Sequence, residues 1–463
     1  MSFLAASVAL ANPWLDPTVE SAATATRIEG VDRLQGAGLD EPWTVGTWKN
    51  APRVVVMPAL RYSIGEGEPF NAGGDLEPGG LSGVARVDTL LSAGPFIAWV
   101  TPEANGAFVP GADFGARFDT AWLGVDSGTW SAGFGRRDRW LGPGRHGALV
   151  LSDNARPPWL GNAAIEGRLP GVFDRLGRWR LEAGGGWMDR PRRDVAHPGL
   201  LLMDLRWPPV PALELGLTRM AMFGGVDRPR PDIGQLILPT EPHVEDDPEH
   251  LLPDQNELAA LDGRLCLPLQ FGRGGPFGYA ELWLQYGGED VIARSLGPIP
   301  YPSLAGIGNL FGAALSVGPM TLTGEYTRLM DDTFRWYVGH RVYHEGFTQD
   351  GRPLGHWGGT DSETGFASVA VKGRRLRGTL WGDVVRRVGV IGTQGDTVFA
   401  FPEEERRWRM GLGGGWLLPN GGWLEVGYAL ERVRGEDFVH GADGWTNRAT
   451  VALAPGLRWA SGR

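Results

Sequence analysis

The stretch WLEVGYALE, residues 423–431, alternates apolar and polar side chains along its whole length. Its apolar face consists of Leu424, Val426, Tyr428 and Leu430, and its opposite face consists of Glu425, Gly427 and Glu431. Successive side chains of a β-strand point to opposite faces of a sheet. A period of two therefore predicts a strand that is apolar on one face and polar on the other.

The same period recurs along the chain from about residue 52 onward. In WRLEAGGGW, residues 179–187, apolar positions alternate with Arg180 and Glu182, and RGTLWGDV, residues 377–384, repeats the pattern. With turn residues as boundaries, the sequence predicts eighteen strands, near residues 52–63, 81–92, 94–101, 115–124, 129–136, 162–172, 179–187, 200–207, 212–221, 257–269, 277–286, 309–317, 320–329, 364–372, 376–386, 405–417, 423–431 and 447–459.

The connections between these strands alternate in length. Short, turn-rich connections lie at 125–128, 174–178, 373–375 and 418–422, whereas long ones lie at 137–161, 222–256, 287–308, 330–363, 387–404 and 432–446. An even strand number with short turns at one end and long loops at the other is typical of an outer-membrane β-barrel, with its short turns in the periplasm. A soluble β-sandwich is the alternative, but its loops need not segregate in this way.

A barrel of this kind predicts the direction of many side chains. Tryptophans near strand ends fit interfacial girdles: Trp122, Trp130, Trp179, Trp187, Trp416 and Trp423. The polar positions would face the lumen: Arg180, Glu182, Glu281, Arg377, Asp383 and Glu425.

Composition excludes several other classes of protein. The formal net charge of the 463 residues is -10 at pH 7, which gives a nucleic-acid partner no electrostatic support. Cys266 is the single cysteine, so the chain has neither an intrachain disulfide framework nor a cysteine metal cluster. No apolar run approaches the roughly 18–20 residues of a membrane-spanning helix.

The first fifty residues differ from the rest of the chain. Residues 1–11 end in Ala-Leu-Ala, a cleavage pattern that indicates the remnant of a signal peptide. Residues 12–50 include apolar positions at nearly helical spacing within 17–38, which predict a small periplasmic helix at the barrel mouth. Residues 51–463 are then the outer-membrane β-barrel.

Two stretches carry a family resemblance. DRWLGPGRHGALVLSDNARPPW, residues 138–159, resembles the W-x-GPG-x-x-G-x-L-x-LS-x-NA-x-P signature of the Wzi-like capsule assembly proteins. YHEGFTQDGRPLGHWGGTDSE, residues 343–363, resembles that family's Y-H-x-G block, and NELAALDGR, residues 256–264, is a weaker match. The resemblance implies an eighteen-stranded outer-membrane barrel, occluded by loops outside and by a helical plug inside. It also implies a lectin-like role in assembling or retaining capsule or exopolysaccharide.

The loop RWYVGHRVYHEG, residues 335–346, contains the residues of the candidate site. His340 and His344 are four apart, which on a helix would begin a zinc site, but glycines at 339 and 346 indicate a loop and no third ligand is apparent. We therefore predict no metal, no cofactor and no catalytic constellation. Aromatic rings with polar neighbours suit a sugar, so the predicted glycan-binding residues are Trp336, Tyr337, His340, Tyr343, His344, Glu345 and Asp361. The alternative for each is that it only fills the lumen and braces other loops, and bracing is the interpretation for Arg139, Trp140 and Asn154.

The sequence is compatible with three functions. The leading one is a surface protein that assembles or retains polysaccharide, the second is a porin for polysaccharide export or solute passage, and the third is a barrel-borne hydrolase. The expected partners are surface polysaccharide, outer-membrane lipid, the barrel-assembly machinery and the polysaccharide export apparatus, with no nucleic acid. The expected location is the outer membrane of a Gram-negative bacterium.

Overall fold

The computed structural model describes residues 53–65, 80–107, 114–188, 192–232, 234, 236, 255–270, 277–296, 299–330, 335–388, 392–394, 397–399, 404–419 and 422–454. The predicted signal-peptide remnant and periplasmic helix, residues 1–11 and 12–50, lie outside these residues. Within the described part of the chain, no helix is long and apolar enough to cross a membrane.

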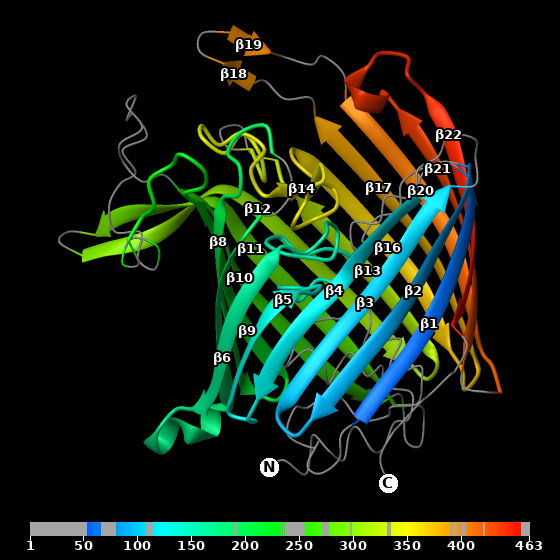
Figure 1. Cartoon of the computed structure of the whole chain (residues 1–463), viewed down its shortest axis with the longest axis horizontal. Helices are drawn as coiled ribbons and strands as arrows, with labels where there is room; N and C mark the ends of the chain where they lie inside the picture. The colour runs from blue at the N-terminus through cyan, green and yellow to red at the C-terminus, as the bar shows by residue number, and fades with distance from the viewer. Residues whose placement is uncertain are drawn as a thin grey trace.

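Eighteen antiparallel strands form one closed sheet (Figure 1). They are β1 (Arg53–Gly65), β2 (Gly80–Ala93), β3 (Phe96–Ala107), β4 (Phe114–Asp126), β5 (Trp130–Arg136), β6 (Trp159–Arg168), β7 (Arg178–Trp187), β8 (Gly199–Val210), β9 (Leu213–Phe223), β10 (Gln255–Gln270), β11 (Phe277–Leu296), β12 (Ile299–Val317), β13 (Met320–Arg328), β16 (Ser362–Lys372), β17 (Leu376–Val388), β20 (Glu404–Leu417), β21 (Trp423–Arg434) and β22 (Gly444–Ala454). Each strand pairs with its neighbours in sequence, and β1 also pairs with β22, from Leu60↔Leu453 to Gly65↔Arg448, which closes the barrel. The predicted fold class and all eighteen strands are confirmed.

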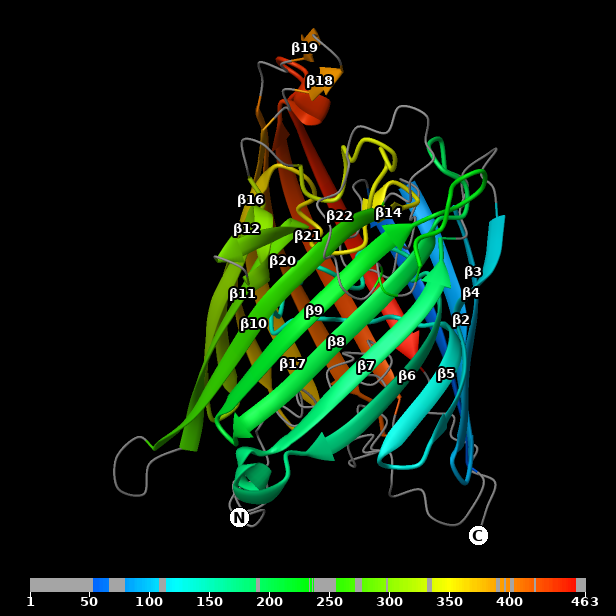
Figure 2. The same ribbon diagram turned by 90° about the vertical axis from the view of Figure 1, so that its left-hand side faces the viewer.

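Smaller elements lie in the connections. They are the hairpins β14 (Thr348–Gln349) with β15 (Arg352–Pro353) and β18 (Gly392–Gln394) with β19 (Thr397–Phe399), and the 3-10 helices η2 (Gly171–Leu176) and η3 (Glu436–Phe438). β1 begins and β22 ends at the short-turn end of the barrel, and the long connections gather at the opposite end, which we call the outer end (Figures 1 and 2).

One predicted loop is wrong. Residues 287–308 were expected to form a long connection, but β11 and β12 continue to pair from Asp290↔Ala305 to Leu296↔Ile299 and extend as a hairpin beyond the wall (Figure 1). The predicted strand ended at residue 286, directly before Gly287 and Gly288. They lie within β11 instead, where a Cβ atom on Gly287 would be 2.9 Å from the ring of Trp336 and one on Gly288 would be 2.7 Å from Leu304. Glycine inside a strand thus marks a close approach of neighbouring groups.

The two faces of the sheet follow the alternation of the sequence. Large apolar side chains are exposed on the outer face, among them Leu123, Ile165, Leu282, Phe311, Leu380, Met410, Val426 and Trp416. The six predicted lumen residues take part in inward ion pairs: Arg180 with Glu182, Glu281 with Arg264, Asp383 with Arg409, and Arg377 with Glu425. This arrangement, apolar outside and charged inside, is that of a transmembrane β-barrel.

Candidate functional site

Two long connections of the outer end fold back into the lumen and form the candidate site. The first, residues 137–158 between β5 and β6, is called the first plug segment, and the second, residues 335–361 between β13 and β16, is called the second plug segment. Both are largely buried: Leu149, Val150, Trp336 and Phe347 are each 0% exposed. The two stretches that carry the family resemblance therefore coincide with the two segments that fill the barrel.

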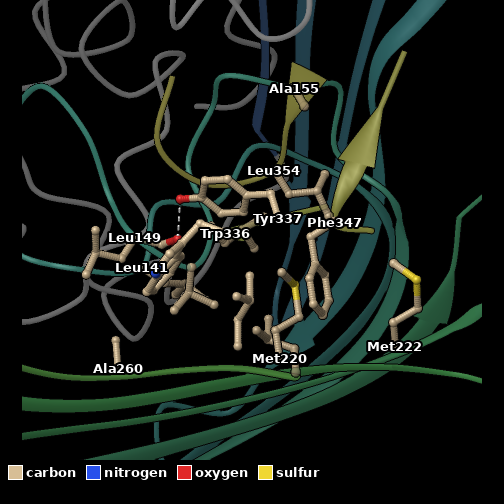
Figure 3. Packing of buried hydrophobic residues seen from close by; sticks show 14 of the residues in the cluster. Leu141, Leu149, Ala155, Met220, Met222, Ala260, Trp336, Tyr337, Phe347 and Leu354 are labelled. Atoms are coloured by element: carbon tan, nitrogen blue, oxygen red, sulfur yellow. Dashed lines mark hydrogen bonds between the residues drawn. The ribbon is translucent and has the colours of Figure 1, made fainter. Parts of the chain in front are cut away.

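A tyrosine hydroxyl joins the two segments (Figure 3). Tyr337 donates a hydrogen bond to the carbonyl oxygen of Leu149 at 2.6 Å and accepts one from the backbone N–H of His356 at 2.7 Å. Burial raises the pKa of Tyr337, so the hydroxyl keeps the proton that it donates. Nearby, the backbone N–H of Ser152 donates to the carbonyl of Leu354 at 2.8 Å. The two segments thus form one hydrogen-bonded unit.

One side of this unit is apolar and packs on β8 to β12. Trp336, Tyr337 and Phe347 belong to a single cluster with Met220 of β9 and Leu258 of β10. Figure 3 shows Trp336, Tyr337 and Phe347 of the plug converging with Met220 of the wall. Burial of a tryptophan removes about 150–250 Å² from water, which at about 25 cal/mol per Å² contributes about 4–6 kcal/mol. Trp336 alone is thus a substantial anchor.

The wall is shaped to receive that indole. A Cβ atom built on Gly308 of β12 would lie 2.5 Å from Cζ2 of Trp336, closer than real contacts allow. Glycine at this position therefore provides the space in which the indole lies against the backbone of β12.

The other side of the plug is polar and meets charged strands. The imidazole of His146 stacks on Phe366 of β16 with ring centroids 3.7 Å apart, and its Nε2 lies 3.5 Å from Asp383 of β17. Arg409 of β20 holds both carboxylate oxygens of Asp383 at 2.7 Å and lies 4.4 Å from the ring centroid of Trp357. The plug thus contacts a continuous arc of the wall from β8 to β20, and Arg139 extends this arc to Glu182 of β7, eight strands from β17 around the closed sheet.

Carboxylates of the wall also hold the backbone of the first plug segment. Glu325 of β13 accepts hydrogen bonds from the amides of Arg145 and His146, at 2.7 and 3.2 Å, and from Nε1 of Trp283 at 3.0 Å. The side chain of Arg145 pairs with Glu281 of β11. Buried polar groups are thus satisfied across the plug–wall boundary, which fixes the position of the plug as well as its shape.

His356 lies at the centre of the plug as a neutral base. Burial, and to a lesser extent the neighbouring His146, lowers the pKa of His356 to about 3. Its Nδ1 accepts a hydrogen bond from the backbone N–H of Gly358 at 3.0 Å, so the proton of the ring is on Nε2. A Cβ atom on Gly147 would lie 2.0 Å from Cδ2 of this ring. The glycine of the first segment is therefore matched to the histidine of the second.

The structure separates the predicted glycan-binding residues into two groups. Trp336, Tyr337 and Tyr343 are 0, 0 and 1% exposed, so their rings are covered by protein. Asp361 is also buried and pairs with Arg335 at 3.2 Å. Only the second group reaches the surface of the plug: His344 is exposed, and His340 and Glu345 are partly exposed.

The surface group continues onto the neighbouring connection between β7 and β8. A carboxylate oxygen of Glu345 accepts the backbone N–H of Arg193 at 3.0 Å, and the backbone N–H of Glu345 donates to Asp194 at 2.8 Å. Arg193 and Arg341 are exposed beside it. We call Arg193, Arg341, His344 and Glu345 the outer patch.

The histidine pair does not have helical geometry. Residues 339–346 form turns and bends, and Nδ1 of His340 accepts the backbone amides of Val342 and Tyr343, both at 3.2 Å. Within the described residues, no three His, Cys, Asp or Glu side chains are grouped so that they could hold a metal ion.

The bracing role predicted for three residues is confirmed. Arg139 pairs with Glu182 and donates to Asn162 at 2.8 Å, Trp140 donates to the carbonyl of Gly144 at 2.9 Å, and Asn154 donates to the carbonyl of Pro353 at 3.0 Å.

Sequence reasoning missed His146, His356, Glu325 and Arg409. The recurring glycines of the two family-like stretches were the available signal, because Gly147 and Gly355 are positions where the opposing segment approaches closely.

Comparison with known proteins now gives this geometry a context. The family model described as "Capsule assembly protein Wzi" matches residues 60–447. Among solved structures, the chain is similar to Wzi of Escherichia coli, described as an outer membrane protein involved in group 1 capsule assembly and a carbohydrate-binding β-barrel. The identity is 18%, the coverage is 86% of this chain and 83% of that one, and the TM-score is 0.62. The outer membrane protein OprD of Pseudomonas aeruginosa is 10% identical, with 90% and 95% coverage and a TM-score of 0.51. No curated protein sequence matches the chain.

Proposed function

Because the chain belongs to the Wzi capsule assembly family, we propose that it retains or assembles polysaccharide at the cell surface by binding it as a lectin does. The protein is an outer-membrane β-barrel of a Gram-negative bacterium, and the predicted location is confirmed.

The observation that carries the proposal is the plug. An open channel needs a water-filled path, whereas here the first plug segment pairs with β7 through Arg139 and with β17 through His146, eight strands apart around the closed sheet, and both segments bury an apolar cluster inside the barrel. This favours a surface platform over the porin function. The proposed role requires binding only and involves no catalytic step.

The outer patch is the proposed contact with glycan. It lies on the outer side of the plug and offers exposed cationic groups on Arg193 and Arg341, a carboxylate on Glu345 and an imidazole on His344. Guanidinium groups bind carboxylates of acidic sugars through two parallel hydrogen bonds, and the other groups bind hydroxyls. Single contacts of this kind are weak, but repeating glycan units add avidity.

The experiment compares cell-associated and released polysaccharide in a strain that lacks the gene and is complemented with variants. We expect the deletion to shift polymer from cells to the medium without reducing its total amount. The variant Arg193→Gln, Arg341→Gln, His344→Gln should reproduce much of that shift. Arg374→Gln with Arg375→Gln, which changes exposed arginines of a short turn at the opposite end, is the matched control and should retain polymer normally.

Two results would contradict the proposal. Polymer that accumulates in the periplasm of the deletion strain would favour export through the barrel, and open-channel conductance of the purified protein in planar bilayers would support that alternative. An unchanged distribution of polymer in all fractions would exclude a role in retention.

A further inference from the structure

A row of charged side chains crosses the outward face of the barrel near the outer end. Cross-strand pairing places Arg328 of β13 opposite Glu363 of β16, and Glu363 opposite Arg386 of β17. The row continues from Arg386 to Arg406 of β20 and from Arg406 to Arg434 of β21. Directly paired residues on one face of a sheet lie about 5 Å apart. The five residues therefore form a continuous band across five strands.

A second row, two residues closer to the middle of each strand, alternates aromatic and cationic groups. Trp408 of β20 pairs with Arg432 of β21, and Arg432 pairs with Trp445 of β22. The guanidinium of Arg432 lies 5.4 Å from the ring centroid of Trp445, and that of Arg434 lies 5.6 Å from the ring centroid of Trp408. An arginine over an aromatic ring keeps its edge N–H groups free for an anion.

The two rows, together with Glu404 of β20, form the outer arginine band: Arg328, Glu363, Arg386, Glu404, Arg406, Trp408, Arg432, Arg434 and Trp445. All of them have the parity of the outward-facing residues of their strands, such as Val384, Met410 and Val426. Glu363 and Glu404 are its carboxylates: Arg386 pairs with both, and Arg406 pairs with Glu404. Since five arginines face these two glutamates, the band carries an excess of positive charge.

The band begins where the apolar face ends. Met410 and Leu430, the outward residues next below Trp408 and Arg432, pair with each other across β20 and β21, and Met410 is 60% exposed. The band thus lies at the upper boundary of the lipid-facing surface, where arginines extend their charged ends into the headgroup region. The neighbouring strands β1 and β2, which follow β22 around the barrel, differ from the band, because Ile64 and Leu81 are paired near their outer ends and are exposed apolar residues.

We propose that the outer arginine band binds the phosphate groups of the phosphorylated glycolipid that forms the outer leaflet. Several convergent guanidinium groups bind phosphate through paired charge-assisted hydrogen bonds. The depth of the band matches the headgroups of a lipid whose acyl chains lie against Met410 and Leu430. Its position on the outward face separates it from the outer patch and the plug, and it does not depend on the proposed glycan binding.

The test uses the purified barrel in detergent, with native mass spectrometry as the readout. Bis-phosphorylated lipid A and its fully dephosphorylated counterpart are titrated separately. We expect the wild-type protein to bind the phosphorylated lipid at least about tenfold more tightly, since several charge-assisted hydrogen bonds are at stake. The variant Arg406→Gln, Arg432→Gln, Arg434→Gln should lose that preference, while the Arg374→Gln, Arg375→Gln control should keep it.

Anomalous migration of unboiled samples verifies that each variant forms the closed barrel. Equal binding of the two lipids to the wild-type protein, or an unchanged preference in the triple variant, would overturn the proposal. It would also be overturned if acidic polysaccharide fragments, rather than lipid, bound to the wild-type band and were lost in the triple variant. A preference that weakens as salt is raised would support the proposal further.

Discussion

Replacing Tyr337 with phenylalanine tests whether one hydroxyl group holds the two plug segments together. The variant keeps the buried ring but removes the donor to Leu149 and the acceptor for the amide of His356, at 2.6 and 2.7 Å. A buried group that loses its partner costs about 1–3 kcal/mol. Two neighbouring groups lose their partner here, and such costs are not fully additive, so we expect the free energy of plug opening to fall by about 2–4 kcal/mol. At about 1.4 kcal/mol per factor of ten, the plug should open roughly 30- to 700-fold more often.

Hydrogen exchange followed by mass spectrometry measures this opening directly. Peptides from both 137–158 and 335–361 should exchange faster in the variant, whereas peptides from the strands serve as an internal reference. Tyr343→Phe is the matched control, because its hydroxyl donates to Gly224 at 3.0 Å and does not join the two plug segments. In that variant, exchange in 137–158 should stay as in the wild type. If Tyr337→Phe leaves exchange of both segments unchanged, the hydroxyl does not hold the plug.

Two further predictions concern the plug. First, because the pKa of His356 is lowered to about 3, the opened plug binds a proton that the closed plug does not at pH values between about 6.5 and 3. The stability of the closed plug should therefore fall by on the order of 2 kcal/mol as the pH drops from 6.5 to 5. The variant His356→Asn, which keeps an acceptor for the amide of Gly358, should flatten that pH dependence in hydrogen-exchange experiments. An equally steep pH dependence in the variant would assign the effect to another group. Second, Gly308→Ala should displace the indole of Trp336 and cost about 1–3 kcal/mol of plug stability, measured by the same hydrogen exchange. Gly365→Ala is the control and should have little effect, because a Cβ atom there meets nothing within 4 Å. Equal effects of the two changes would show that the wall relaxes freely around the indole.

The fold could be predicted from the sequence because each strand carries its own signal. In WLEVGYALE the lipid-facing and lumen-facing residues alternate, and this local period is independent of the rest of the chain. The extensions of β11 and β12 could not be predicted from the sequence, because a glycine pair such as Gly287 and Gly288 is compatible with two structural roles. A glycine pair can end a strand, or it can admit Trp336 and Leu304 from elsewhere in the chain, and only the tertiary structure distinguishes these cases.

The candidate site was harder to predict, since a loop has no period to indicate which side chains are buried. Trp336 and Tyr337 in a glycine-rich loop resemble a sugar platform. Their burial depends on wall residues such as Met220 and Leu258, more than seventy positions away in sequence. The outer arginine band could not be predicted from the sequence for the same reason. Arg328, Arg386 and Arg434 become neighbours only through the register of the strands.

The plug has two chemically different sides, and this difference explains how it finds one position in the lumen. Its apolar side can be buried only against β8 to β12, where inward positions such as Met220 and Leu258 are apolar. Its polar side, with His146, must face the carboxylate of Asp383, because a rotated plug would bury that charge against leucine and methionine. The family-like stretches thus encode a fit between plug and barrel. Residues that determine which polysaccharide is bound should accordingly lie on the exposed surface of the plug, as Arg193 and Arg341 of the outer patch do. Swapping these residues between family members should then change glycan preference, while the protection of the plug against hydrogen exchange stays as in the wild type.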